Sequence, residues 1–219
     1  MPSGGQFLSI EVTPDLGRAD TGFNDWAGRI TDWGPAWRDI VTLFRRHEKG
    51  HLDSEGAQTG PDFPPLSTRS PPPGGYEAWK DKRYPGLPIL QREKVLFRAL
   101  TEGGQGSIDK RTKTSLRVGI NPNASLRDPG RAGTYNLGEA AKAHATGDGV
   151  PVRPPVRFDE SVQNRSAFGY AVAQILQAHI VKARREALTR EIEAAIGGPA
   201  PPHRGPDKTI AAILSKKWR

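Results

Sequence analysis

The chain has 219 residues, a formal net charge of +8 at pH 7 and no cysteine. Disulfide bonds and thiolate metal sites are therefore excluded, and the excess of Lys and Arg favours an anionic partner without identifying it. With 25 Gly, 20 Pro and 35% hydrophobic residues, the composition predicts one small hydrophobic core with long loops. Oligomerisation would help to stabilise such a core. No apolar run reaches the roughly 18 residues of a membrane span, and no secretory signal pattern is present. We therefore expect a protein made in the cytoplasm, without a membrane partner.

The first expected elements are a strand and a helical region. Residues Gln6 to Thr13 alternate in polarity with a period of two, which is typical of a half-buried strand. Between Phe23 and Trp33 apolar residues recur every three or four positions, which predicts a short helix. After Pro35 the same stripe resumes and predicts a longer helix to about Lys49.

The segment from about Asp53 to Pro88 is rich in proline, which opposes regular helix and sheet. The sequence therefore predicts a long extended arm. The arm carries Phe63, Trp79 and Tyr84, whose aromatic rings can dock against another surface. We take these three as candidate contacts between subunits.

The second half of the chain alternates short elements with loops. The expected elements are a helix from Ile89 to Leu100, strands over Gly106–Lys110 and Thr114–Ile120 around a basic turn, a helix from Tyr135 to His144, and a long helix from Phe168 that ends at Gly197.

Prolines keep the segment from Val150 to Phe158 extended at a low entropic cost. We expect this to leave Arg153 and Arg157 projecting beside Pro154, as further candidate contacts between subunits. The alternative for Arg153 is an ordinary surface salt bridge.

Together these elements predict an α+β fold in which a small antiparallel sheet packs with a long C-terminal helix and N-terminal helices. We expect one domain over residues 1–196, including the arm at about 53–88. A C-terminal tail over 197–219 completes the chain.

One sequence motif suggests a catalytic metal site. His47, Glu48 and His51 match the HExxH pattern, in which two histidines on one helix face bind zinc and the glutamate acts as general base. The extended pattern of such peptidases places a glycine and a third histidine where this chain has Ser54 and Ala57. We therefore prefer the alternative, that these residues are partly solvated and continue the apolar helix face that precedes them. The chain is then not an enzyme and needs no cofactor or metal.

A series of local signals in a fixed order resembles the tailed-bacteriophage virion-morphogenesis or tail-completion family. The segments that carry the resemblance are Ser54-Glu55-Gly56, Phe63-Pro64-Pro65-Leu66-Ser67, Tyr76-Glu77-Ala78-Trp79-Lys80, Pro88-Ile89-Leu90-Gln91-Arg92, Ser115-Leu116-Arg117-Val118-Gly119, Tyr135 with His144 and Gly147, and Val150-Pro151-Val152-Arg153-Pro154-Pro155. They cover about half of the chain. The sequence departs from the family at Phe63, where a tryptophan is usual, and at Glu93-Lys94, which replaces a Thr-Gly pair.

The resemblance implies a structural virion protein of the head–tail neck, assembled in the host cytoplasm. Its role would be a tail-completion or head–tail joining ring subunit, with a tail terminator or a connector or stopper subunit as alternatives. The implied partners are further copies of the chain and other neck and tail proteins. Genomic DNA in the channel is a further candidate partner, contacted by Lys110, Arg111 and Lys113. A zinc peptidase and a DNA-binding module remain the competing hypotheses.

Overall fold

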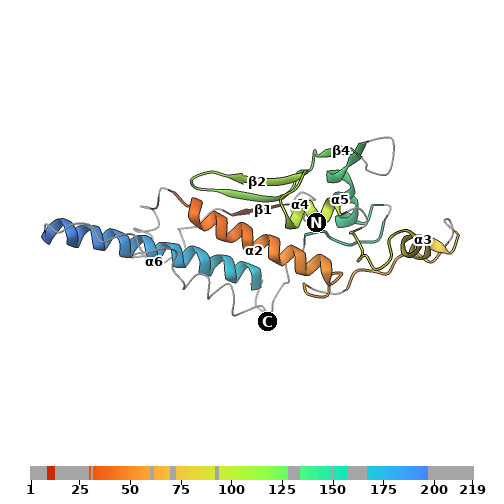
Figure 1. Ribbon diagram of the computed structural model, residues 1–219, viewed down its shortest axis with the longest axis horizontal. Helices are drawn as coiled ribbons and strands as arrows, with labels where there is room; N and C mark the ends of the chain where they lie inside the picture. The colour runs from red at the N-terminus through yellow and green to blue at the C-terminus, as the bar shows by residue number, and fades with distance from the viewer. Residues whose placement is uncertain are drawn as a thin grey trace.

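The computed structural model describes residues 9–12, 30, 32–59, 62–69, 73–91, 94–127, 134–148, 150–156 and 167–196. These residues form an α+β fold, which confirms the expected class (Figure 1). In chain order the elements are β1 (Ser9–Val12), α2 (Gly34–Asp53), α3 (Gly75–Arg83), α4 (Val95–Thr101), β2 (Ser107–Arg111), β3 (Leu116–Ile120), β4 (Ser125–Arg127), β5 (Thr134–Asn136), α5 (Leu137–Thr146) and α6 (Ala167–Ile196). Most of the short helix expected over 23–33, the tail over 197–219 and Arg157 lie outside the described residues.

The main sheet has three antiparallel strands in the order β1-β3-β2. In the central strand β3, Leu116, Val118 and Ile120 are buried and Arg117 is exposed, so one face of the sheet covers the core and the other meets solvent. Both strands expected around the basic turn are confirmed. The sequence did not predict the second, two-stranded sheet of β4 and β5, whose strands have only three residues each.

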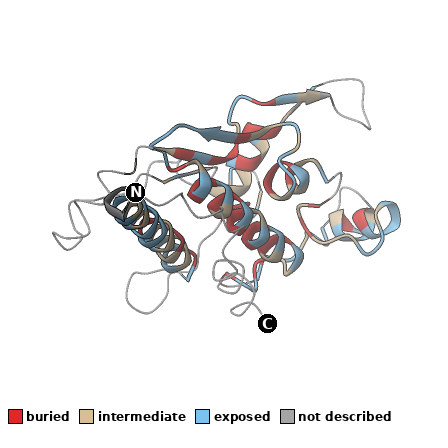
Figure 2. Cartoon of the chain, turned by 60° about the vertical axis from the view of Figure 1, so that its left-hand side comes forward, coloured by how far each residue is buried: buried red, intermediate tan, exposed pale blue. Residues whose placement is uncertain are grey.

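Helix α2 is the centre of the fold, because the sheet and α4 pack on one side of it and α6 packs on another (Figures 1 and 2). Its apolar residues recur every three or four positions, and Trp37, Ile40 and Phe44 are completely buried. Pro35 lies in its first turn, as expected. The helix continues to Asp53, however, and the expected end at about Lys49 is wrong.

The long C-terminal helix α6 belongs to the fold through α2. Phe168 meets Phe44 edge to face with ring centroids 6.4 Å apart, and Nε2 of His179 lies 2.8 Å from a carboxylate oxygen of Asp39. The C-terminal part of α6 extends beyond the first turn of α2 (Figure 1). No helix within the described ranges is long and apolar enough to cross a membrane.

The proline-rich arm contains a regular helix, which corrects the expectation of a wholly extended segment. Helix α3 occupies residues between Pro73 and Pro85 and contains no proline itself. Gly75, the first residue of α3, has a positive φ of 83°, and a Cβ atom there would lie 2.3 Å from the carbonyl carbon of Thr68. A glycine is therefore required where the chain turns into the helix.

Helix α4 begins at Val95, and the expected start at Ile89 is wrong. Leu90 and Lys94 adopt positive φ angles of 66° and 56°, which interrupt a helix. The C-terminal end agrees with the prediction, because Gly103 follows the helix with a positive φ of 72°. Helix α5 ends in the same way at Gly147, and the side chain of Asn136 caps its first turn by accepting a hydrogen bond from the Glu139 N–H.

Candidate functional site

The HExxH string lies in the buried C-terminal half of α2. His47, Glu48 and His51 are 4%, 0% and 0% exposed. Their expected place on the Trp37–Phe44 face of the helix is confirmed, and their expected partial solvation is wrong. This end of α2 is covered from two sides, because the His47 ring meets Phe168 of α6 and the His51 ring meets Phe63 of the arm, each with centroids 5.2 Å apart.

His51 uses both ring nitrogens to join separate parts of the chain. Its Nε2 lies 2.9 Å from the carbonyl oxygen of Pro154, and its Nδ1 lies 2.6 Å from the hydroxyl oxygen of Thr59. A carbonyl oxygen can only accept, so Nε2 carries a hydrogen, and in the neutral ring Nδ1 then accepts the hydrogen of the Thr59 hydroxyl. Neither nitrogen then has a lone pair to offer a metal ion.

Glu48 is a carboxyl group inside the core. Its Oε1 lies 3.0 Å from Nδ1 of His47, and its Oε2 has no hydrogen-bond partner among the residues that the structure describes. Burial raises the pKa of Glu48 from 4.5 to about 7, although the hydrogen bond to His47 opposes this increase. Burial therefore favours the protonated form of the Glu48 carboxyl.

This geometry does not fit the zinc site that the HExxH string suggested. A catalytic zinc needs lone pairs on both histidines and an open coordination position for water. His51 has its nitrogens engaged, and Glu48 is sealed from solvent. In the described part of the chain, no three His, Asp or Glu side chains come close enough together to hold a metal ion.

Arg153 anchors the arm to the core. Its guanidinium donates from Nε and Nη2 to the carbonyl oxygen of Pro64, at 2.9 and 2.7 Å, and from Nη2 to that of Pro65 at 2.8 Å. Its main-chain N–H donates to the carbonyl oxygen of His144. Arg153 is buried, and burial lowers its pKa. The expectation that Arg153 projects from the surface is therefore wrong. The carbonyl oxygen of the neighbouring Pro154 is also engaged within the chain, by the hydrogen bond to His51.

The arm leaves the core and returns to it at nearly the same place. A carboxylate oxygen of Glu55 accepts a hydrogen bond from the Ile89 N–H at 2.7 Å, and the Gln91 amide donates to Asp53 at 3.0 Å. Between these closed ends Phe63 is buried against His51. The described parts of the arm are therefore tied to the core, and α3 lies at the end of the molecule remote from the C-terminal end of α6 (Figure 1).

Two of the candidate contact residues come together on this loop. Trp79 stacks on Tyr76 with centroids 5.2 Å apart and meets Tyr84 edge to face at 6.1 Å. All three rings are partly exposed, and we call them the α3 aromatic cluster. Phe63, expected to share their role, belongs to the core instead.

The basic turn between β2 and β3 is held rigidly above the first turns of α2. The Trp37 indole donates to the Thr112 carbonyl oxygen at 2.9 Å, and the Trp33 N–H donates to that of Lys113 at 2.9 Å. Lys110 and Lys113 have exposed side chains. We call residues 110–113 the basic turn.

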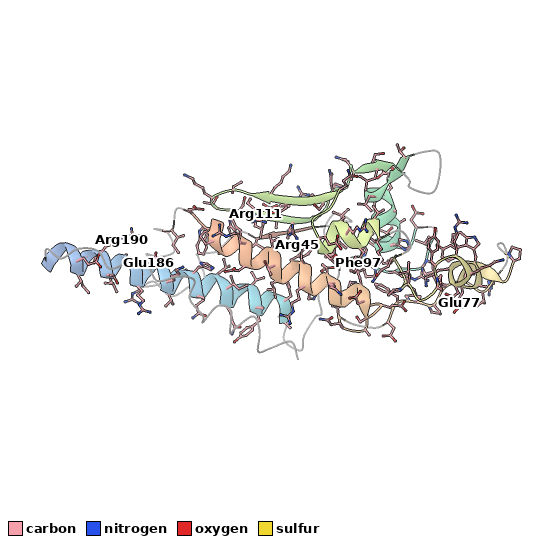
Figure 3. The ribbon with its side chains drawn as sticks, in the orientation of Figure 1. Arg45, Glu77, Phe97, Arg111, Glu186 and Arg190 are labelled. Atoms are coloured by element: carbon pink, nitrogen blue, oxygen red, sulfur yellow. The ribbon has the colours of Figure 1, made fainter. Side chains whose placement is uncertain are left out.

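Arg111 is already bound within the chain. Its Nε and Nη2 each donate to a carboxylate oxygen of Asp109 at 2.6 Å, and Arg45 of α2 approaches the same carboxylate at 3.1 Å (Figure 3). The hydrogen bonds from Arg111 lower the pKa of Asp109. Arg111, one of the three candidate DNA contacts, is therefore bound to a carboxylate within the chain, which it shares with Arg45.

An acidic hollow lies at the opposite end of α2, between its last turn, the arm and α3. It has a volume of about 570 Å³. Five carboxylates and one lysine line it, and these charged residues are Asp53, Glu55, Asp62, Glu77, Lys80 and Asp81. Figure 3 shows Glu77 on α3 at this end of the molecule. The sequence did not predict the hollow, because its carboxylates come from three segments with no shared spacing.

No match to this chain was found among protein-family models, curated proteins or solved structures. The likeness to the tail-completion family therefore rests on the order of the sequence motifs alone.

Proposed function

We propose that this chain is a structural subunit of a homo-oligomeric ring in the neck of a tailed-phage virion, where it completes the tail or joins it to the head. The observation that supports a ring is the placement of opposite charges at the two ends of α2. The basic turn lies above the first turns of this helix, and the acidic hollow lies at its last turn.

Opposite charges at opposite ends favour head-to-tail contacts between copies. A helix of 20 residues is about 30 Å long, so the basic turn and the hollow of one copy are too far apart to meet each other. A contact between two different surfaces repeats around a closed ring when the rotation per subunit closes. Lys110 and Lys113 of one copy would then approach the hollow of the next.

The α3 aromatic cluster supports the same arrangement. It lies beside the acidic hollow, because Lys80 and Glu77 of α3 line that hollow. Partly exposed Tyr and Trp rings are typical of interface centres, and surrounding charges set the orientation of the partner. The placement of the ring in a phage neck is supported by the motif order in the sequence.

The test is a charge-swap experiment on the full chain. Light scattering after size exclusion should find a ring for the wild type, and Lys110→Glu with Lys113→Glu should reduce it to smaller species. Adding Asp62→Lys and Asp81→Lys should restore part of the ring, because the two exchanges cancel the formal negative charge of the hollow and so remove its repulsion of the new glutamates. The control with the same charge change, Lys142→Glu with Lys182→Glu, should leave the ring intact.

The neck assignment has its own test. Mass spectrometry of tailed particles from the source strain should detect the chain, and electron cryomicroscopy should place it in a ring at the head–tail junction. Position along the neck would separate the completion role from the terminator and the connector or stopper roles. Particles without the chain would contradict the assignment.

A further inference from the structure

Helix α6 has two apolar faces, and within the described part of the chain one of them packs on the core while the other carries exposed side chains. Phe168 and Ile175 are buried on the side toward α2. The large hydrophobic residues that remain exposed on this helix are Tyr170, Val181, Leu188 and Ile192. At 100° per residue these four fall within about 40° of one another, on the side away from Phe168 and Ile175. We call them the outer stripe of α6.

The outer stripe is exposed both beside α2 and where α6 extends beyond it. Val181, Leu188 and Ile192 are 54%, 42% and 59% exposed. Figure 3 shows Glu186 and Arg190, which lie between them in sequence, on the part of α6 that projects from the body of the molecule. Exposed apolar stripes on a helix are typical of surfaces that bind another helix.

From this stripe we infer that α6 pairs with α6 of a second copy, antiparallel, about a two-fold axis at Val181. The spacing of the stripe is self-complementary. Tyr170 and Ile192 lie eleven positions before and after Val181, a distance of about 16 Å along the helix in each direction. An antiparallel pair therefore places Val181 against its own copy and Tyr170 against Ile192 of the second copy, as a two-fold contact requires.

The charges of α6 favour this orientation over a parallel one. Residues 167–181 contain no Lys, Arg, Asp or Glu, and the charged side chains begin at Lys182. In an antiparallel pair, Arg184 and Arg185 next to the stripe face the uncharged half of the second helix, close to Gln177 and Ala178. In a parallel pair each arginine would meet its own copy, and like charges at such positions repel.

The contact is separate from the proposed ring. It uses the outer side of α6 and leaves the basic turn and the acidic hollow free, so it can join two free subunits or two rings in opposite orientation. A helix pair about 33 Å long is a small interface, and we expect association in the micromolar range.

Single cysteines test the pairing, since the chain has none of its own. Under mild oxidation Val181→Cys should form a disulfide-linked dimer, because its copies meet on the axis. Ile192→Cys alone should form no disulfide-linked dimer, while a mixture of Ile192→Cys and Tyr170→Cys should form the mixed disulfide. The control Lys182→Cys, exposed one position away from the stripe, should not cross-link. Self-linked Ile192→Cys would show a parallel pair and overturn the inference, as would Val181→Cys that stays reduced.

Sedimentation of the full chain over a range of concentrations gives the second measurement. Val181→Glu and Leu188→Glu should abolish the two-fold association and leave the melting temperature unchanged, because both side chains are exposed in the single chain. The ring-defective Lys110→Glu with Lys113→Glu variant should still dimerise. Masses that do not respond to Val181→Glu at any concentration would overturn the inference without affecting the proposed ring.

Discussion

Nε2 of His51 donates a hydrogen bond to the carbonyl oxygen of Pro154, 2.9 Å away, and so joins residues that are 103 positions apart. The same ring accepts a hydrogen bond from Thr59 at its other nitrogen. His51 therefore connects α2, the start of the arm and the segment at 150–156. A residue that looked like a metal ligand acts as a cross-link of the core.

Replacing His51 by Phe should destabilise the protein. The substitution keeps an aromatic ring but leaves the Pro154 carbonyl and the Thr59 hydroxyl buried without their partner. We expect the free energy of unfolding to fall by about 2–4 kcal/mol, measured by urea denaturation. His179→Phe gives the matched control, since its bond to Asp39 is only partly buried, and should cost less than about 1 kcal/mol. Equal losses in the two variants would contradict the cross-link.

Metal removal should have no effect on the folded chain. The nitrogens of His51 are engaged in hydrogen bonds, so no zinc contributes to stability at this position. We expect the melting temperature to be the same with and without EDTA, and elemental analysis to find no stoichiometric zinc. A structural or catalytic zinc would make the melting temperature fall on chelation.

Glu48 should make stability depend on pH. The pKa of Glu48 is raised from 4.5 in a model carboxyl to about 7 in the fold, so between these values the folded state holds a proton that the unfolded state has released. The free energy of unfolding therefore falls as pH rises through this window, by a total of about 3 kcal/mol.

Glu48→Gln removes this dependence, because an amide does not ionise. The variant should match the wild type near pH 4.5 and be more stable above pH 7, as measured by urea denaturation across the window. Glu139→Gln, exposed on α5, should differ from the wild type by less than about 0.5 kcal/mol at every pH. If the curves of Glu48→Gln and the wild type stayed parallel, the buried carboxyl would not be the cause.

The sequence identified helix faces better than it identified burial. The period of Trp37, Ile40 and Phe44 predicts the inner face of α2, and His47 and Glu48 continue the same period. Their polarity nevertheless suggested solvent. Phe168 of α6, which packs on His47, lies more than a hundred residues away, and local spacing carries no information about such contacts.

Local patterns also misplaced the start of α4 and missed α3. Apolar spacing from Ile89 onward resembles a helix, but the Ile89 N–H is bound to Glu55 and the chain turns at Leu90 and Lys94 before α4 begins. In the arm, prolines bracket α3 rather than exclude it. The acidic hollow could not be predicted, because the closed ends of the arm bring its carboxylates together.

Arg153 should hold the arm against the core. Arg153→Met removes three hydrogen bonds to the carbonyl oxygens of Pro64 and Pro65, and we expect trypsin to cleave the folded protein at Arg69 at least several times faster. The free energy of unfolding should fall by about 2–4 kcal/mol, since hydrogen bonds to a charged group are lost in a buried place. Arg98→Met, at an exposed position of α4, should change neither quantity. Unchanged cleavage at Arg69 in Arg153→Met would show that other contacts fix the arm.

Substitutions at Phe63 and Trp79 should have separate effects, the first on stability and the second on ring assembly. Phe63 is 6% exposed and packs on His51, so Phe63→Ala should cost about 3–5 kcal/mol of stability. Trp79 contacts Tyr76 and Tyr84 on α3, remote from the core. Trp79→Ala should therefore leave the melting temperature nearly unchanged, whereas light scattering should show that the ring is lost, because a central aromatic anchor of the interface is missing. Trp79→Phe retains a ring for stacking and should recover part of the assembly. A Trp79→Ala protein that still forms complete rings would exclude the α3 aromatic cluster from the subunit interface.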